Sequence, residues 1–278
     1  MTISEIIKNA LIEDIGDGDH SSLASIDKNA SAKARLLVKE DGILAGIEIA
    51  KEVFNQVDPN LKLEILINDG ASIKRGDIIF YVSGSAISIL SAERTVLNFM
   101  QRMSGIATST NKLVKLVEGT NCTILDTRKT TPGVRIIEKM AVRIGGGDNH
   151  RMGLYDMIML KDNHIDYAGG IKNAIQKTKN YLNQTGKDLK IEIEARSIND
   201  VEQIIEVGGV YRIMLDNFTP ELLSQAVKLI NKRYETEASG NITHDNILEY
   251  AKTGVDFISS GALTHHIKSL DLSLKAVI

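Results

Sequence analysis

Polar residues that could bind an anionic sugar phosphate follow six apolar runs in the second half of the chain. The runs that predict strands are 122–126, 156–160, 189–195, 211–215, 234–239 and 255–259. Helical patterns fall between most of them, and repeated strand–helix units indicate a parallel sheet. In such folds the chemistry gathers at the carboxyl ends of the strands, so the residues at these ends form the first candidate site.

Cations follow the first two strands, and carboxylates close the next two. The segment 126–129 (DTRK) ends the first strand, and Lys161 follows the second. Arginine and lysine suit carboxylate or pyrophosphate oxygens. Glu194 and Asp216 lie at the ends of the third and fourth strands. Carboxylates at such positions suit sugar hydroxyls or a divalent metal ion.

Ser-Gly pairs follow the last two strands. They are Ser239-Gly240, with Asn241 next, and Ser260-Gly261. Glycine lets backbone N–H groups approach an anion closely, and a helix that follows adds its positive end, so these turns suit a phosphate. One polar residue at a strand end indicates only a solvated loop. Six ends that sort into three chemical types favour an enzyme that acts on an anionic sugar phosphate.

A glycine-rich segment precedes the second strand. Gly145–Gly147 predict a flexible or left-handed turn, and His150 and Arg151 follow on a loop that we expect to face an anion. The segment is not a dinucleotide-binding fingerprint, because GxGxxG at a strand-to-helix turn is missing, and the sequence has no GxxxxGK[ST]. His150 and His164 lack the spacing of metal ligands such as HExxH, so no zinc site is predicted.

The first part of the chain mixes helices and strands. Spacing predicts helices at 3–14 and 47–57, and strands and turns within 32–46 and 61–84. A long helix then begins at Ser91, whose hydroxyl can cap it.

The chain divides into two predicted regions, residues 1–105 and 106–264. In the second region Arg135, Lys139 and Arg143 lie four residues apart on a predicted helix, where a solvated face is the expectation. The periodicity leaves open whether the parallel sheet is an open doubly wound sheet or an incomplete α/β barrel.

The bulk composition narrows the class of protein. The chain has 278 residues, a net charge of −3 and a pI near 6.1, so the basic footprint of a nucleic-acid-binding protein is absent. No apolar run has the length of a membrane span, and the start of the chain does not read as a secretory signal. The lone Cys122 opens an apolar run and predicts a buried thiol. Together these features favour a soluble cytoplasmic protein without membrane or nucleic-acid partners.

Three motifs around the strand ends resemble one known family. They are DTRKTTPG (126–133), GGGDNHRMGLYD (145–156) and LKDNH (160–164), and they resemble quinolinate phosphoribosyltransferase, also called carboxylating nicotinate-nucleotide pyrophosphorylase. Further matches follow the family's order: EDIGDGDHSS, AERTVLNFMQRMSGIAT, IEIEA, IMLDNF, EASGNIT and ISSGALTH. The resemblance therefore covers nearly the whole chain.

The resemblance implies a fold and an assembly. The family pairs an N-terminal α/β sandwich domain with an incomplete α/β barrel, and its C-terminal tail, here 265–278, returns to the N-terminal domain. It also implies at least a homodimer, with Arg94 reaching the active site of the partner subunit and a hexamer as the larger alternative.

The resemblance also implies a reaction, in which quinolinate and phosphoribosyl pyrophosphate give nicotinate mononucleotide, pyrophosphate and CO2 in the synthesis of NAD. Mg²⁺ accompanies the pyrophosphate. Arg94, Arg128 and Arg151 would hold the two carboxylates of quinolinate. The full set of substrate-binding residues that the resemblance implies is Arg94, Thr127, Arg128, Lys129, His150, Arg151, Lys161, Glu194, Asp216, Ser239, Gly240, Asn241 and Gly261.

Within that set, four residues would take part in catalysis: Lys129, Lys161, Glu194 and Asp216. Glu194 and Asp216 would hold ribose hydroxyls, directly or through Mg²⁺, and Ser239, Gly240, Asn241 and Gly261 would cradle the 5′-phosphate.

Two positions depart from the family's usual pattern. Asn241 replaces a glycine, and asparagine tolerates left-handed backbone angles better than most residues, so we expect the phosphate cradle to survive. His266 replaces a smaller residue. Two rival interpretations remain, a phosphoribosyltransferase for nicotinate itself and a non-catalytic sensor. The full set of cations favours a dianionic substrate, and the presence of Lys161, Glu194 and Asp216 argues against the sensor.

Overall fold

The structure is a computed structural model that describes residues 1–277 and forms two compact units. The first unit comprises Met1–Asn111, Thr130–Gly146 and the chain from Ala262 onward. The second comprises Lys112–Lys129 and Gly147–Gly261. The segment 130–146, which lies between two strands of the second unit in sequence, thus belongs to the first.

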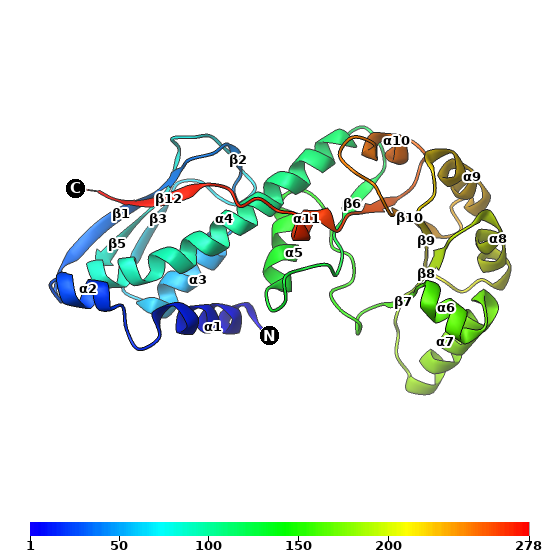
Figure 1. Cartoon of the computed structure of the whole chain (residues 1–278), viewed down its shortest axis with the longest axis horizontal. Coiled ribbons are helices and arrows are strands. Elements are labelled where there is room, and N and C mark those ends of the chain that lie inside the picture. Colours follow the sequence, from blue (N-terminus) through cyan, green and yellow to red (C-terminus); the bar gives the residue numbers. More distant parts are fainter. Residues whose placement is uncertain (278) are drawn as a thin grey trace. The chain divides into compact units, whose positions relative to one another are not determined.

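An antiparallel sheet of four strands, in the order β12-β1-β5-β3, forms the centre of the first unit. Its strands are β1 Ser31–Val38, β3 Lys62–Ile65, β5 Ile78–Ser85 and β12 Leu272–Ala276. A small ladder joins β2 Gly42–Ile43 to β4 Ser72–Ile73. Figure 1 shows β12, in red, beside β1, in blue, and their register runs from Ala34 opposite Ala276 to Val38 opposite Leu272. The end of the described chain is therefore part of the first unit's sheet.

Helices complete the first unit. They are α1 Ile3–Ile15, α2 His20–Ser25, α3 Ile47–Val57, α4 Ala86–Leu116, α5 Arg135–Ile144 and α11 Ala262–His265. The predicted helices at 3–14 and 47–57 are confirmed. The core is aromatic and aliphatic: Phe54 of α3 meets Phe80 of β5 edge to face, with ring centroids 5.9 Å apart, and both side chains are fully buried.

Two expectations for this unit are wrong. The long helix begins at Ala86, directly after β5, so Ser91 lies inside it and its hydroxyl donates to Asp19 instead of capping. Lys139 of α5 is only 1 % exposed, although a solvated face was expected there. The neighbouring Glu138 is also buried and accepts hydrogen bonds from the Arg102 guanidinium and from Thr131 N. The expectation of a solvated face fails only at Lys139, because Arg143 is exposed and Arg135 is partly exposed.

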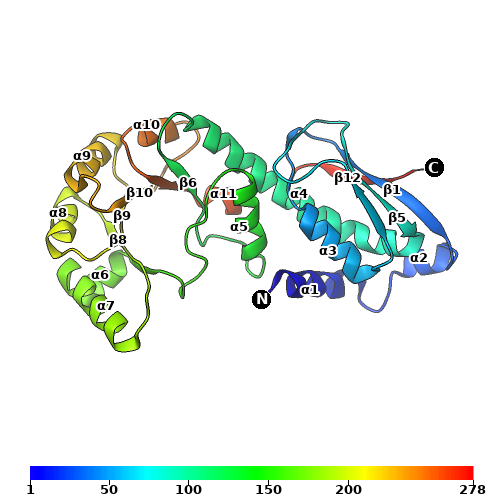
Figure 2. The same ribbon diagram turned by 180° about the vertical axis from the view of Figure 1, so that it is seen from behind.

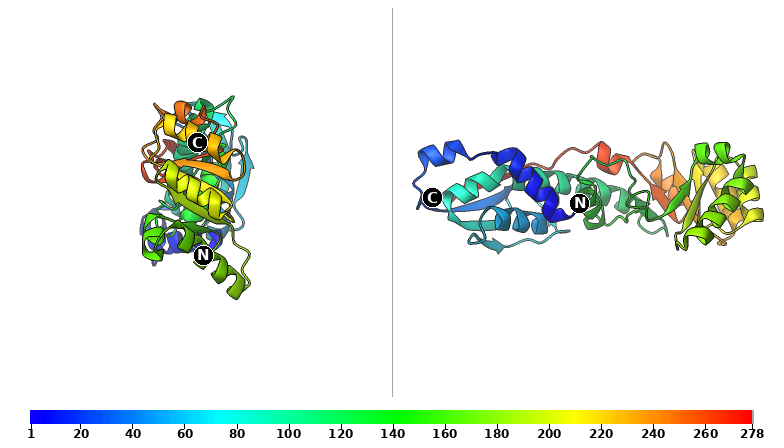
Figure 3. Two further views of the ribbon diagram at one scale, coloured as in Figure 1. Left: turned by 90° about the vertical axis from the view of Figure 1, so that its right-hand side faces the viewer. Right: turned by 90° about the horizontal axis from the view of Figure 1, so that it is seen from below.

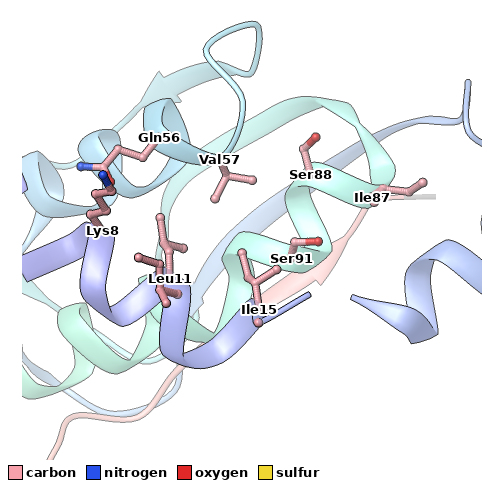
Figure 4. Close-up of a pocket in the computed structure, with 10 residues that line it drawn as sticks. Lys8, Leu11, Ile15, Gln56, Val57, Ile87, Ser88 and Ser91 are labelled. Atoms are coloured by element: carbon pink, nitrogen blue, oxygen red, sulfur yellow. The ribbon is translucent and has the colours of Figure 1, made fainter. Parts of the chain in front are cut away.

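A hollow in the first unit lies where α1, α3 and α4 meet (Figure 4). Aliphatic side chains such as Leu11, Ile15 and Val57 line it, and Lys8 is the one cation among its lining residues. Its lining does not match a highly anionic substrate. We therefore look for the chemistry in the second unit.

The second unit is built on a parallel sheet in the order β6-β11-β10-β9-β8-β7. The strands are β6 Thr123–Leu125, β7 Ile158–Leu160, β8 Ile191–Ala195, β9 Arg212–Asp216, β10 Glu235–Ser239 and β11 Phe257–Ser259. All six predicted strands are confirmed, each within three residues at either end.

The helices of the second unit lie along one face of this sheet. They are α6 Asp162–Ala168, α7 Ile171–Thr185, α8 Ile198–Val207, α9 Pro220–Ile230 and α10 Ile247–Ala251. Figures 1 and 2 show them outside the curve of the strands, and in the side view of Figure 3 they stand in front of the sheet. A doubly wound sheet carries helices on both faces, whereas a barrel carries them outside. The helices cover one face of the sheet, and β6 and β7 are its two edge strands and do not pair with each other. This is the arrangement of an incomplete α/β barrel.

The strands of this barrel present different residues to their two faces because side chains alternate along a strand. Ile193, Ile213 and Leu215 are fully buried on the face toward the helices. Charged residues occupy the alternate positions and so line the interior of the curve.

The residues that begin two of the helices are typical N-caps. Ser197 caps α8, and Thr219 caps α9 with Pro220 in the first turn. Cys122, before β6, is buried as predicted, and burial raises the pKa of its thiol to about 12.

Among residues 1–277 no helix combines the length and the apolar character that crossing a membrane requires.

Candidate active site

The carboxyl ends of β8, β9 and β10 bring together the acidic residues predicted for the site. Asp216 pairs with Ser239 in the ladder, and Ser239 Oγ donates to Asp216 Oδ1 at 2.6 Å. The Nδ2 of Asn217 donates to the other oxygen of Asp216, also at 2.6 Å. Lys161, after β7, places Nζ 3.9 Å from Glu194 Oε2. Four strand ends therefore contribute to one group of polar side chains.

Asp216 is close enough to Glu194 to act on its ionisation. Glu194 is 6 % exposed, and burial, followed by the negative charge of Asp216, raises the pKa of its carboxyl group, while Lys161 acts against both. Two adjacent carboxylates at the mouth of a barrel attract a positive charge. A divalent cation or a developing positive charge on a sugar would satisfy them.

The turn after β10 is shaped by left-handed residues. Gly240 has φ +90°, and a Cβ there would collide with the Oδ1 of Asn217. Asn241 has φ +54°, which confirms that asparagine adopts the backbone expected of the family's glycine. Its Nδ2 donates to Asn217 Oδ1 at 3.1 Å. The turn therefore lies directly against the residue that holds Asp216. Gly261, at the end of the second unit, follows Ser260, whose N–H donates to Leu125 O beside β6.

A buried carboxylate organises the cationic side of the site. Asp126 is fully buried at the end of β6, and it accepts hydrogen bonds from His150 N at 2.9 Å and from Asn149 Nδ2 at 2.6 Å. These bonds hold the loop before β7 against the end of β6. Next to Asp126, Thr127 Oγ1 accepts from Lys129 N at 3.0 Å, and the Lys129 side chain is exposed. The two predicted cationic motifs are thus joined through Asp126.

Arg128 and Arg151 lie near each other on this side. The guanidinium of Arg151 donates to Met157 O at 3.1 Å. Burial, and next the positive charge of Arg128, lowers the pKa of Arg151. Arg128 itself is exposed. Two neighbouring guanidinium groups repel each other, and an anion with two carboxylates would relieve that repulsion.

His150 connects this side to the interior of the barrel. Its side chain is 4 % exposed, and Nε2 lies 3.1 Å from Glu192 Oε2 and 3.2 Å from Glu237 Oε2. Its Nδ1 accepts a hydrogen bond from Arg151 N at 2.7 Å. Below these residues, Arg212 donates to Glu237 at 2.9 Å. We call His150, Glu192, Glu237 and Arg212 the interior cluster.

The carboxylates of the interior cluster favour protons within it. Burial lowers the pKa of His150, but the two carboxylates more than offset this and raise it to about 9. Burial, and then the charge of Glu237, raises the pKa of Glu192. Because Arg151 N–H occupies Nδ1, the ring nitrogen that faces both carboxylates is Nε2.

The interior cluster also has the donor set of a metal site. One ligand atom from each of His150, Glu192 and Glu237 lies within 4.8 Å of the others. The hydrogen bond to Nδ1 argues against a metal, because a neutral ring that accepts at Nδ1 must carry its proton on Nε2, the nitrogen that would bind. Sequence spacing could not have shown this group, since its members come from three distant segments. Glu194 and Asp216 fit Mg²⁺ better, because they are oxygen donors at the ends of adjacent strands.

Sequence reasoning missed Glu192, Arg212 and Glu237. The available signal was the alternation in IEIEA (191–195) and ETEAS (235–239), where every second residue is acidic or polar within a predicted strand of a parallel sheet. Arg94 and His266 belong to the first unit, and both are exposed. All other predicted site residues belong to the second unit, and their roles toward substrate stay predictions.

Comparisons with known proteins place these observations in one family. Two family models match the chain, the N-terminal domain of quinolinate phosphoribosyl transferase over residues 19–104 and its C-terminal domain over residues 106–275. A tobacco (Nicotiana tabacum) protein named quinolinate phosphoribosyltransferase [decarboxylating] 1b is 49 % identical over 97 % of this chain and 81 % of its own length. A Bacillus subtilis protein named probable nicotinate-nucleotide pyrophosphorylase [carboxylating] is 41 % identical over 100 % of this chain and 94 % of its own. The crystal structure of NadC from Streptococcus pyogenes matches with a TM-score of 0.93 and 40 % identity, covering 99 % of this chain and 97 % of that one.

Proposed function

The chain belongs to the quinolinate phosphoribosyltransferase family, and we propose that its reaction takes place at the carboxyl end of the six-stranded sheet. It is a decarboxylating phosphoribosyltransferase that converts quinolinate and phosphoribosyl pyrophosphate to nicotinate mononucleotide, pyrophosphate and CO2 in NAD biosynthesis. One observation carries the assignment of the site. A cationic side, with Arg128 and Arg151, and an acidic side, with Glu194 and Asp216, lie at one end of the same sheet.

The cationic side binds quinolinate. Arg128 and Arg151 lie close enough for each to face one carboxylate of a small aromatic dianion, and a guanidinium can donate two parallel hydrogen bonds to a carboxylate. The repulsion between the two arginines raises the free energy of the empty site. Binding of the dianion removes this repulsion, which strengthens binding. Lys129 and Lys161 add positive charge for the pyrophosphate of the second substrate, and Arg94 of a partner subunit completes the pocket in a homodimer.

The acidic side stabilises the ribose in the transition state. As pyrophosphate leaves, positive charge grows on the anomeric carbon and the ring oxygen. Glu194 and Asp216 are fixed beside each other, and Asp216 is held by Ser239 and Asn217, so neither needs to reorganise as that charge appears. The same carboxylates accept hydrogen bonds from ribose hydroxyls.

The turn Ser239-Gly240-Asn241 and Gly261 bind the 5′-phosphate. The left-handed backbone of Gly240 and Asn241 makes a tight turn after β10. This supports the role, because glycine-containing turns let backbone N–H groups approach an anion closely. A phosphate there would lie beside Asn217 and so at a fixed offset from Asp216, which orients the ribose between the phosphate and the leaving group.

Loss of CO2 needs no general base. Once the ring nitrogen carries the ribose, it is cationic and stabilises the electron pair that the breaking carbon–carbon bond leaves on the adjacent ring carbon. A proton from water then takes the place of the lost carboxylate. The arginine that holds the remaining carboxylate keeps the ring in place, and exclusion of water favours loss of the other carboxylate.

Mg²⁺ bound between Glu194, Asp216 and the substrate would neutralise charge on the leaving pyrophosphate. We place the enzyme in the cytoplasm as a homodimer, since both the composition and the requirement for Arg94 support that state. A phosphoribosyltransferase for nicotinate would need one carboxylate-binding cation fewer, so the paired arginines favour quinolinate.

The test uses quinolinate labelled in both carboxyl groups, phosphoribosyl pyrophosphate and Mg²⁺, with nicotinate in a parallel reaction. We expect labelled CO2 and nicotinate mononucleotide in equal amounts from quinolinate, and no nucleotide from nicotinate. Omitting Mg²⁺ and adding a chelator should abolish turnover. Turnover of nicotinate alone would contradict the role given to the paired arginines.

A further inference from the structure

The His150 ring has close polar neighbours at both nitrogens. Nδ1 accepts the backbone N–H of Arg151 at 2.7 Å, and Nε2 lies between the carboxylates of Glu192 and Glu237 at 3.1 and 3.2 Å. The side chain is 4 % exposed, so its polar edges face the protein. A ring in this position has little surface to offer a substrate. It is well placed to link the position of Arg151 to the positions of Glu192 and Glu237.

The carboxylates on the inner side of His150 are rigidly placed. Glu192 lies in β8 and Glu237 in β10, the strands on either side of β9, and both side chains are fully buried. Arg212 of β9 holds Glu237 through NH1 at 2.9 Å. Within the described residues no well-aligned hydrogen bond reaches either oxygen of Glu192, so its nearest polar partner is the His150 ring. Two strands of the barrel therefore determine where Nε2 can lie.

The outer side of His150 leads to the substrate. The residue that donates to Nδ1 is Arg151, whose guanidinium neighbours that of Arg128. Repulsion between two arginines would move a freely jointed loop outward. Three anchors hold this loop: Asp126 accepts His150 N, Met157 O accepts the Arg151 guanidinium, and His150 Nδ1 accepts Arg151 N. The third anchor depends on the orientation of the ring, and the ring depends on the interior carboxylates.

We propose that Glu192 and Glu237 are positioning residues for quinolinate binding, which fix the His150 ring from inside the barrel and through it hold Arg151 beside Arg128. The inference rests on the proposed function, because it assigns quinolinate to the two arginines. It gives His150 a positioning role through Arg151 and makes the buried charges of β8 and β10 part of substrate recognition.

The first experiment replaces Glu192 with methionine. Removing one partner from a buried group of charges can lower stability, so thermal unfolding accompanies the kinetics. Glu192→Gln, which keeps the volume and a carbonyl acceptor, is the second variant if Glu192→Met does not fold. We expect KM for quinolinate to rise about tenfold or more, because the variant loses the contact between Glu192 and the His150 ring. KM for phosphoribosyl pyrophosphate should change less than about twofold, because its ligands lie on other strand ends. A role limited to stability would lower the melting temperature and leave both KM values unchanged, and that result would overturn the inference.

A matched pair of variants separates the contact with His150 from a change of charge near Arg212. Glu237→Gln and Glu235→Gln change neighbouring inward-facing residues of β10 in the same way. Both glutamates bind Arg212, and only Glu237 lies against His150. We expect only Glu237→Gln to raise KM for quinolinate. Equal effects of the two variants would show that any charge change near Arg212 suffices, which overturns the role given to the His150 contact.

Two substitutions of His150 test the link to Arg151. The Oδ1 of asparagine can replace Nδ1 as the acceptor for Arg151 N, whereas the amide nitrogen of glutamine reaches the place of Nε2 and leaves Nδ1 without a substitute. His150→Asn should therefore keep a lower KM for quinolinate than His150→Gln. In the His150→Asn background, Glu192→Met should add nothing, because its effect passes through the ring.

An additive double variant would overturn the inference. So would one equivalent of divalent metal that the wild-type protein retains after dialysis against a chelator and that Glu192→Met loses. A wild-type enzyme without turnover of quinolinate would overturn the proposed function and this inference with it. Normal wild-type turnover with unaffected variants would overturn the inference alone.

Discussion

The two ends of the same strands treat charge in opposite ways. At the amino ends of β8–β10, opposite charges are paired: Arg212 binds Glu235 through Nε and NH2 at 3.1 and 2.8 Å and stacks on Phe257 at 4.0 Å. At the carboxyl ends, like charges are neighbours: Arg151 lies near Arg128, and Glu194 lies near Asp216. The opposite pair at this end, Lys161 and Glu194, is separated by 3.9 Å.

The difference separates a stabilising end from a binding end. Paired buried charges keep each other satisfied, and breaking one pair leaves an uncompensated charge inside the protein. Neighbouring like charges raise the free energy of the empty site, and a ligand of opposite charge lowers it again. Apart from Glu192 and Glu237, whose contacts with His150 lead toward the site, substitutions at the amino ends should therefore change stability without activity. Substitutions at the carboxyl ends should do the reverse.

The largest expected effect belongs to Arg128. Arg128→Ala removes a charge-assisted carboxylate contact, and we expect kcat/KM for quinolinate to fall about a thousandfold. The free energy of unfolding should stay within about 0.5 kcal/mol of the wild-type value, because the side chain is exposed and its removal ends the repulsion with Arg151. Steady-state kinetics and thermal unfolding of the same preparation measure both. Arg128→Lys keeps the charge without the planar fork, so its kcat/KM should lie between those of Arg128→Ala and the wild type. A kcat/KM within about threefold of wild type would exclude Arg128 from direct contact with substrate.

Asp216 should have the next largest effect. Asp216→Asn keeps the shape of the side chain and its acceptor for Ser239 Oγ, and removes the negative charge beside the ribose. We expect kcat to fall about a hundredfold with KM for quinolinate nearly unchanged, since the carboxylate acts on charge that appears only in the transition state. Ser239→Ala, which removes a hydrogen bond to Asp216 and keeps the charge, is the control and should cost less. An unchanged kcat in Asp216→Asn would assign this carboxylate to structure instead of catalysis.

Tyr211 tests the stabilising end. Its hydroxyl donates to Glu235 Oε1 at 2.5 Å, and Tyr211→Phe removes only that bond. We expect a loss of about 1 kcal/mol in the free energy of unfolding and no change in kcat/KM. Denaturant titration measures the first and steady-state kinetics the second. If kcat/KM fell more than about threefold, the two ends would be coupled, and the separation between them would fail.

The six strands and the chemistry of their ends could be predicted because both leave local patterns, whereas the order of the strands could not. The six parallel strands follow from apolar runs alternating with helical spacing, and the left-handed backbone of Asn241 follows from its residue type. The start of α4 could not be predicted, because β5 passes into the helix at Ala86 without a break and Ser91 resembles a cap in isolation. The burial of Lys139 depends on tertiary packing that helical spacing does not encode.

The interior cluster shows the same limit for the site. A glutamate within an apolar strand reads as a solvent-facing residue of an alternating strand, and only closure of the sheet into a barrel turns Glu192 and Glu237 inward. His150 joins them from a loop some forty positions earlier than the first of them. The cationic and acidic strand ends needed only the rule that parallel strands end at one edge. The cluster needed the three-dimensional course of three separate segments.

Asn241 should have the smallest effect, and it tests whether the phosphate turn works through its backbone. Asn241→Gly removes a hydrogen bond between exposed side chains and relaxes a left-handed residue, two changes that nearly cancel, so stability and KM for phosphoribosyl pyrophosphate should stay within about 0.5 kcal/mol and about twofold of wild type. Asn241→Val cannot adopt φ +54° without strain and should raise that KM about tenfold while KM for quinolinate stays the same. If Asn241→Gly were as harmful as Asn241→Val, the side chain of Asn241 would bind the phosphate. The turn would then depend on a side chain that the family's usual glycine lacks.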